Sequence, residues 1–322
     1  MPSTDKINYS IRLNKSIERN IIFDILHHSS KIFNLQNYRY IGLGSLWFVD
    51  FMLAHKQLAI DSMISIEEDS YNAVRAEFNK PYACIDVKKG ESTLVLRDIP
   101  LEERKLLVWL DYDSSLNGPV LKDLAILCER APAGSILITS INAHKSSLPN
   151  VDETGKEFGT DLDRMRYYAG DLIPSELPRR SMQTSGYPAF LSKILFTQIQ
   201  HQITANGRTD IKIFPFLNMY YKDDAPMITI GAALLENSAD SALAEKLKSI
   251  RIFEQMDADH QMAITAPPLT LKEKAALDQL MPSATPPSEK DIEALGFKMK
   301  PSHTNSYHKF YLYYPTYAEL FS

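Results

Sequence analysis

Short apolar runs alternate with amphipathic segments over the first two thirds of the chain. Runs that are apolar at nearly every position are typical of strands buried on both faces of a parallel sheet. They occupy residues 39–45, 63–66, 82–87, 106–110 and 135–141. Around them, apolar residues recur at three-to-four spacing, which predicts helices. These helices are expected over residues 11–34, 46–58, 70–79, 119–131 and 189–205.

A closing pair of strands follows this alternation. Two apolar runs, residues 211–221 and 226–235, are separated by only four residues, and so short a link predicts an antiparallel pair. We therefore expect an α/β protein with a doubly wound, mostly parallel seven-stranded sheet. Residues 1–35 are expected to form an N-terminal helical extension, residues 36–237 a Rossmann-like domain, and residues 238–322 a C-terminal α+β extension.

Two segments depart from the alternating pattern. Residues 143–188 are polar and rich in turns, and so long a connection favours an inserted lid or binding loop. In the tail, helices are expected near residues 239–257, 270–281 and 288–295, and the aromatic run 310–314 is interpreted as a strand.

Composition and charge narrow the class of protein. Of 322 residues, 44% are apolar and 23% charged, which excludes a largely disordered or fibrous chain. A net charge of −5 argues against general coating of nucleic acid. Two cysteines, Cys84 and Cys128, exclude a disulfide framework. No apolar run reaches the roughly 18 residues of a membrane span, and residues 1–10 lack an apolar signal core, so we expect a cytoplasmic protein without membrane contact.

A glycine turn comes directly after the first predicted strand. Gly42 permits a tight turn, and Gly44 lets a ligand approach backbone N–H groups. The third glycine of a dinucleotide fingerprint is absent, since Leu46 stands in its region. The turn thus favours a ligand that places no phosphate here; a turn without any ligand is the alternative interpretation.

Acidic residues end the next three strands. Glu67 ends the second, Glu91 follows the third and Asp111 ends the fourth. Carboxyl ends of parallel strands share one edge of the sheet, so these groups are expected beside the glycine turn. A carboxylate at Glu67 can accept hydrogen bonds from both hydroxyls of a ribose.

This order of elements resembles the class I S-adenosylmethionine-dependent methyltransferases over about residues 36–236. Residues 40–46 correspond to the family's glycine motif, without its leading acid and last glycine. The resemblance implies S-adenosylmethionine as cofactor. It implies a cofactor site formed by Gly42, Gly44, Ser45, Glu67, Glu68, Glu91, Ser92 and Asp111.

The fourth-strand motif, residues 108–113, is similar to that of small-molecule O-methyltransferases and to that of tRNA guanine N-methyltransferases. Asp111 and Asp113 in this motif are candidates for the catalytic base. His144, which follows the fifth predicted strand, is a third candidate, and a loop histidine without a role is its alternative interpretation. Of the metal-binding Asp-Asn pair of the first group only Asn142 matches, so no metal site is predicted, and a divalent cation at Asp111 and Asn142 stays an open alternative.

Function follows from this resemblance. The leading hypothesis is methyl transfer to an oxygen or nitrogen of a small molecule or nucleic acid. Arginines and tyrosines interleaved in residues 143–188 suit a nucleic-acid acceptor. The alternative is a catalytically degenerate scaffold module of a bacterial assembly such as a phage-defence system, with a protein partner at the C-terminal extension. A homodimer is also open.

Charged residues in the first predicted helix allow two interpretations. Lys15, Glu18 and Arg19 fall on one turn. Together with Arg12 they either cover the cofactor crevice or contact a phosphate; the alternative is a solvated helix face with a weak ion pair.

Overall fold

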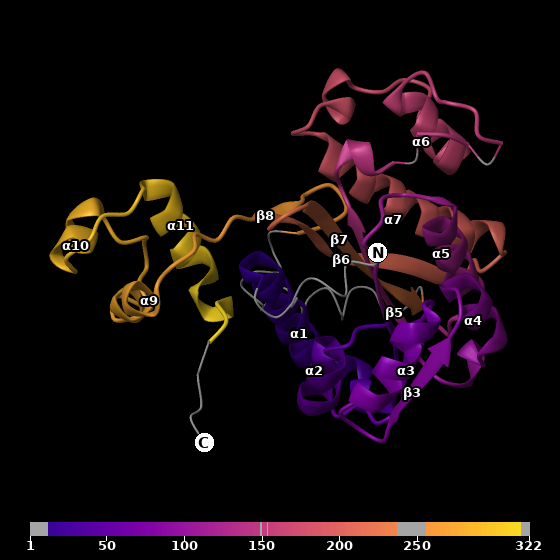
Figure 1. Cartoon of the computed structure of the whole chain (residues 1–322), viewed down its shortest axis with the longest axis horizontal. Coiled ribbons are helices and arrows are strands. Elements are labelled where there is room, and N and C mark those ends of the chain that lie inside the picture. Colours follow the sequence, from indigo (N-terminus) through magenta and orange to yellow (C-terminus); the bar gives the residue numbers. More distant parts are fainter. Residues whose placement is uncertain (1–11, 149, 153, 237–255, 317–322) are drawn as a thin grey trace.

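The computed structural model describes residues 12–316 apart from 149, 153 and 237–255. A mixed sheet lies at the centre, and helices cover both of its faces (Figure 1). The predicted α/β class and doubly wound arrangement are confirmed. The helix expected over residues 239–257 falls almost wholly outside the described residues. Within the described chain, no helix combines the length and apolarity needed to cross a bilayer.

The described strands form one sheet in the order β3-β2-β1-β4-β5-β7-β6-β8. They are β1 (Arg39–Leu43), β2 (Met63–Glu67), β3 (Ile85–Lys89), β4 (Leu106–Asp111), β5 (Ile136–Asn142), β6 (Ile211–Lys222), β7 (Pro226–Glu236) and β8 (Met262–Ile264). Strands β1 to β5 pair in parallel, and β7 runs antiparallel between β5 and β6, so the expected closing hairpin is confirmed. The expectation of seven strands missed β8, because three residues leave no periodic signal.

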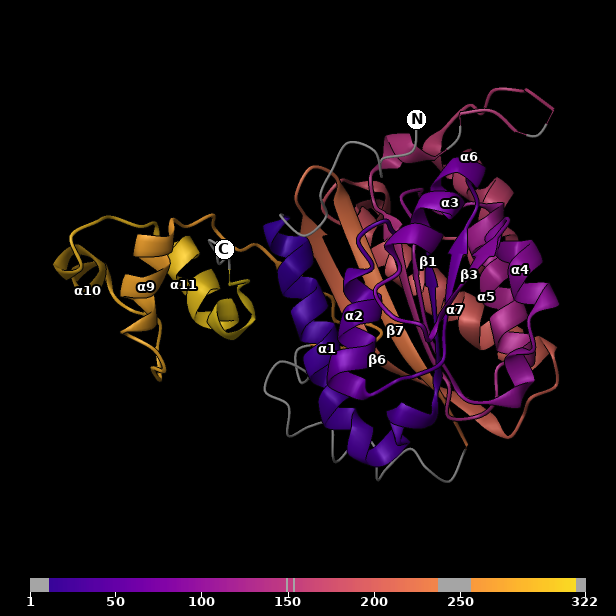
Figure 2. The same ribbon diagram turned by 60° about the horizontal axis from the view of Figure 1, so that its bottom comes forward.

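Helices pack on both sides of this sheet. They are α1 (Leu13–Phe33), α2 (Val49–Leu58), α3 (Ser70–Asn79), α4 (Ser92–Asp98), α5 (Gly118–Arg130), α6 (Asp161–Ala169), α7 (Tyr187–Ala205), α9 (Leu271–Asp278), α10 (Glu289–Ala294) and α11 (Pro301–Phe310). Figure 2 shows α1 and α2 on one face and α4, α5 and α7 on the other. Helix α1 buries Ile17, Ile21 and Ile25 completely, which is the apolar stripe that its three-to-four spacing predicts.

The C-terminal region corrects one prediction. Residues 310–314 do not form a strand, because Phe310 ends α11 and Tyr311–Tyr313 form a 3-10 turn. Buried Tyr307, Phe310 and Tyr314 stand at spacings of three and four, which is a helical pattern that the aromatic content masked. In both views α9, α10 and α11 project from the side of the molecule that carries α1, and α10 lies farthest from that helix (Figures 1 and 2).

Two element boundaries also differ from the prediction. Helix α2 begins at Val49 and not at residue 46, because Phe48 before it has a left-handed backbone with φ of 48°. Strand β3 begins at Ile85, three residues later than expected, after a turn that follows α3. The connection between β1 and α2 is therefore longer than predicted.

The insertion leaves the sheet at the carboxyl end of β5 and contains α6. The rings of Tyr167 and Tyr168 lie 5.0 Å apart, and both pack on Phe158. Arg164 lies 2.5 Å from the Asn150 side chain and pairs with Asp161. These aromatic and basic side chains therefore hold the insertion together.

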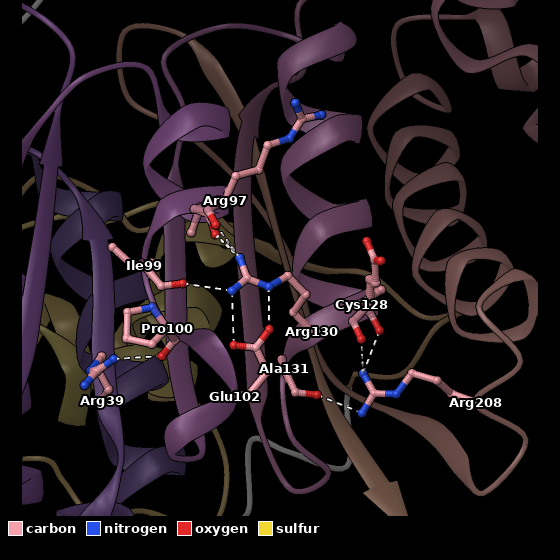
Figure 3. Close-up of polar contacts among 11 residues, drawn as sticks. Arg39, Arg97, Ile99, Pro100, Glu102, Cys128, Arg130, Ala131 and Arg208 are labelled. Carbon is pink, nitrogen blue, oxygen red and sulfur yellow. Dashed lines mark hydrogen bonds and ion pairs between the residues drawn. The ribbon is translucent and has the colours of Figure 1, made fainter.

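Two arginines satisfy carbonyl groups at the ends of α4 and α5 (Figure 3). Arg130 donates to the Ile99 carbonyl at 3.0 Å, and its Nε lies 2.5 Å from the Glu102 carboxylate. Arg208 donates to the Ala131 carbonyl at 2.8 Å. Helix ends leave such carbonyls without partners inside the helix. Both arginines thus secure the amino-terminal edge of the parallel strands, opposite the candidate site.

Candidate functional site

The carboxyl edge of the parallel strands carries two adjoining hollows, which together form the cleft. The larger hollow has a volume of about 360 Å³ and the smaller about 70 Å³. Both are lined by Leu43, Gly44, Asp111 and Asp113. The ends of β1 and β4 thus form the junction of the cleft, as the strand order predicts for a switch point of a doubly wound sheet.

Gly44 and Glu67 are in close contact at this junction. The Gly44 N–H donates to the Ile66 carbonyl at 2.5 Å, which holds the turn against β2. A Cβ at position 44 would collide with the Glu67 carboxylate. A larger residue at this position would therefore have to displace the Glu67 side chain.

The Glu67 side chain is mostly shielded from water, with 9% of the residue exposed. Burial raises the pKa of this carboxyl, and the neighbouring charges of Asp69 and Glu68 add to the effect. The Asp69 N–H donates to Glu67 Oε1 at 3.2 Å and opposes it. A carboxylate held this way has further acceptor positions, and it lines the larger hollow.

The remaining residues expected at the cofactor divide into two groups. Ser45 lines the smaller hollow, and Glu68 and Ser92 line the larger one. Gly42 is buried beneath the turn and lines neither; a Cβ there would press on Phe51 at 3.1 Å. Glu91 is exposed at the start of α4 and also lines neither hollow.

Asp111 forms an ion pair with Lys15, whose role the sequence alone did not decide. Lys15 Nζ lies 2.6 Å from Asp111 Oδ2 and 3.0 Å from Glu18 Oε2, with only 4% of the Lys15 side chain exposed. Burial alone would lower the pKa of Lys15, but the two carboxylates outweigh it and raise this pKa above its ordinary value. The interpretation of this helix face as solvated is wrong.

A chain of hydrogen bonds continues from Glu18 across the sheet. Thr229 on β7 donates to Glu18 Oε1, and its Oγ1 lies 2.7 Å from Ser140 Oγ on β5. Trp109 Nε1 on β4 donates to the same Ser140 oxygen at 3.0 Å. Helix α1 is thereby joined to the three strands that carry the Asp111 end of the cleft.

Asp113 and His144 differ in their relation to the cleft. Asp113 is exposed and lines both hollows. His144 lines neither, and its Nδ1 lies 2.6 Å from the Ser146 hydroxyl. Asn142 Oδ1 accepts the His144 N–H at 2.8 Å. Among the described residues no group of three or more His, Cys, Asp or Glu side chains could hold a metal ion.

One family model matches the chain over residues 7–322, and its description is "putative O-methyltransferase". The chain belongs to this family. The resemblance to class I methyltransferases stated above is thereby confirmed. Comparison with curated proteins finds no match.

Solved structures match the chain at low identity. A structure of Trm1 from Pyrococcus horikoshii with S-adenosyl-L-methionine is 13% identical, with a TM-score of 0.49, over 77% of this chain and 60% of that one. An O-methyltransferase from Bacillus cereus in complex with SAH is 12% identical, with a TM-score of 0.38, over 71% and 84%. The chain therefore spans less than two thirds of the Trm1 structure.

This O-methyltransferase family member places Arg19 at the cleft, which is one of the two positions that the sequence left open for it. Arg19 on α1 lines the smaller hollow, and its Nε pairs with Asp50 on α2. Burial alone would lower the pKa of Arg19, but Asp50 raises it. The available signal was a cluster of charges, with Glu18, inside a helix otherwise buried by isoleucines.

Proposed function

We propose that the protein is an S-adenosylmethionine-dependent methyltransferase, with the cofactor in the cleft and an oxygen or nitrogen atom as methyl acceptor. The observation that carries this proposal is the contact between Gly44 and Glu67. A turn without a side chain faces a shielded carboxylate there, within a hollow of about 360 Å³. Membership in the O-methyltransferase family supports the class of reaction.

The residues of the cleft suit the parts of this cofactor. When bound, S-adenosylmethionine supplies a methyl group on a positively charged sulfur. Glu67 would accept hydrogen bonds from ribose hydroxyls, and Arg19 would hold the carboxylate of the amino-acid end. Asp111 and Asp113 give the junction a negative charge that favours a cation. We therefore propose that the cofactor binds although the glycine motif lacks its leading acid, because side chains from other elements supply the polar contacts.

The catalytic base is assigned by position. Lys15 and Glu18 hold the Asp111 carboxylate from the side of α1, so we give Asp111 a positioning and electrostatic role. Asp113 is exposed where the two hollows meet, and we propose it as the group that receives the acceptor's proton. His144 lines neither hollow, so we do not assign the proton transfer to it.

Titration calorimetry with S-adenosylhomocysteine tests the cofactor site. The Gly44→Ala variant should bind at least about 100-fold more weakly, because the added Cβ displaces the Glu67 carboxylate. Gly118→Ala is the matched control, since a Cβ at that position meets nothing within 4 Å and binding should be unchanged.

Transfer of a labelled methyl group from S-adenosylmethionine to fractionated small molecules or RNA then identifies the acceptor. No binding by the unmodified protein at millimolar S-adenosylhomocysteine would contradict the proposal. That result would favour the scaffold module in its place.

A further inference from the structure

Strand β3 lies at one edge of the sheet, and among the described strands none pairs with its outer side. On its inner side β3 pairs in parallel with β2, and the Gly90 N–H donates to the Glu67 carbonyl at 3.0 Å. In a parallel pair every second residue directs both its N–H and its C=O to the same neighbour. The even-numbered residues of β3 therefore point their backbone groups toward β2, and the odd-numbered residues point theirs outward.

The side chains of this edge carry opposite charges at positions related by symmetry. Asp86 and Lys88 lie on the same side of β3, pair at 2.8 Å, and have side chains that are 59% and 43% exposed. Val87 between them packs against the apolar cluster that also includes Ala76 of α3. The charges at equal distances before and after Val87 are thus opposite in sign.

Helix α3, which packs against β2 and β3, leaves an apolar stripe exposed beside this edge (Figure 1). The stripe consists of Tyr71, Val74 and Phe78, which stand at spacings of three and four and are 68%, 72% and 89% exposed. Ala73 and Ala76 are buried on the other side of the helix. A group of large apolar side chains with this exposure is typical of an interaction surface.

We propose that two copies of this chain form a dimer by pairing their β3 strands in antiparallel about a two-fold axis at Val87. The outward N–H and C=O of Val87 then bond to the same groups of Val87 in the second copy. Asp86 faces Lys88 of the second copy, and Lys88 faces its Asp86, so both cross-strand pairs are attractive. An axis at residue 86 or 88 would instead place like charges opposite each other. The charges therefore specify one register.

The same axis brings the two apolar stripes to one face of the joined sheet. Strands lie about 4.8 Å apart, so a helix above β2 and β3 lies about 5 Å from the axis, and the two α3 helices lie about 10 Å apart. That separation is typical of helices in contact. A pair of five-residue strands buries little surface by itself, and the stripes supply the apolar area that a stable dimer needs.

Sedimentation equilibrium of the full chain tests this dimer. The unmodified protein should have twice the mass of the 36.5 kDa chain. Asp86→Lys and Lys88→Asp should each weaken the dimer at least about tenfold, because both cross-strand pairs become pairs of like charge. Lys193→Asp is the matched control and should leave the dimer unchanged, since Lys193 forms its exposed ion pair with Asp259 on another part of the surface.

Mixing the two charge variants tests the register. A copy with Asp86→Lys is positive at both positions, and a copy with Lys88→Asp is negative at both. An equimolar mixture should therefore form a mixed dimer about as tightly as the unmodified protein does, which also shows that both variants are folded. Phe78→Glu should weaken the dimer at least about tenfold by placing a charge in the stripe. Its control is Leu271→Glu on α9, where the replaced side chain is 65% exposed.

Three results would overturn the proposal. They are a monomer at every concentration, a dimer that is unaffected by Asp86→Lys and Lys88→Asp, and a mixture of these two variants that stays monomeric. None of these measurements involves the cofactor, so such a result would leave the proposed function standing.

Discussion

At the scale of single residues, the buried charge of Glu67 lowers the stability of the folded protein. Burial raises its pKa, so the folded protein holds the proton more tightly than the unfolded chain does. Such a group contributes stability below its unfolded pKa and loses that contribution as the pH rises through the higher folded pKa. At neutral pH the charge therefore costs stability, and ligand hydroxyls that bind it would repay the cost.

Glu67→Gln should accordingly separate stability from binding. At pH 8 the variant should be more stable by about 0.5–1 kcal/mol, since a neutral side chain of the same shape replaces the shielded charge. The gain should be smaller at pH 5, because protonation of the wild-type carboxyl increases as the pH falls. Affinity for S-adenosylhomocysteine should fall. Urea unfolding at both pH values and calorimetry measure these effects; a variant less stable at pH 8 would contradict the role given to burial.

At the scale of elements, α1 depends on a distant residue for its start. Its N-cap, Arg12, makes no side-chain capping bond. Instead, Asp223 in the turn between β6 and β7 accepts the N–H groups of Asn14 and Lys15 at 3.1 and 3.0 Å. These are first-turn donors without a partner inside the helix. The closing hairpin thus positions the helix that carries Lys15 and Arg19 to the cleft.

Replacing this cap should loosen the helix. Asp223→Ala should destabilise the protein by about 1–2 kcal/mol in urea unfolding, the cost typical of a lost N-cap. The adjacent Asp224→Ala is the control: Asp224 pairs with Arg12 at 3.3 Å but is 74% exposed, so its loss should cost less than about 1 kcal/mol. Equal effects of the two changes would show that the cap contributes nothing.

At the scale of the whole molecule, the N-terminal and C-terminal segments share one core with the sheet. Ile21 of α1, Trp109 of β4 and Phe310 of α11 belong to the same buried apolar cluster. The buried ion pair from Lys15 to Asp111 ties the first helix to the fourth strand across that cluster. The boundaries at residues 35 and 238 therefore separate stretches of sequence whose side chains pack together.

Loss of the buried lysine should affect the whole fold. Lys15→Met should destabilise the protein by about 3–5 kcal/mol, because Asp111 and Glu18 lose their buried partner charge. Lys274→Met is the matched control. Lys274 makes an ion pair of 2.7 Å with Asp278, and the two side chains are 23% and 41% exposed, so its loss should cost less than about 1 kcal/mol. Denaturant unfolding of both variants, followed by circular dichroism, distinguishes them; a loss below 1 kcal/mol for Lys15→Met would contradict this coupling.

The sequence by itself determined the sheet and the edge that carries the cleft. Apolar periodicity is a local property, and parallel strands must place their carboxyl ends together, so Gly44, Glu67 and Asp111 were predictable as neighbours. Only the tertiary structure decided which polar side chains from distant elements come together around this edge. Thr229 reaches Glu18 across 211 positions, and Asp123 reaches Ser92 across 31. Such pairs depend on how elements pack, and a charged residue on a helix has the same local pattern whether it meets water or a buried carboxylate.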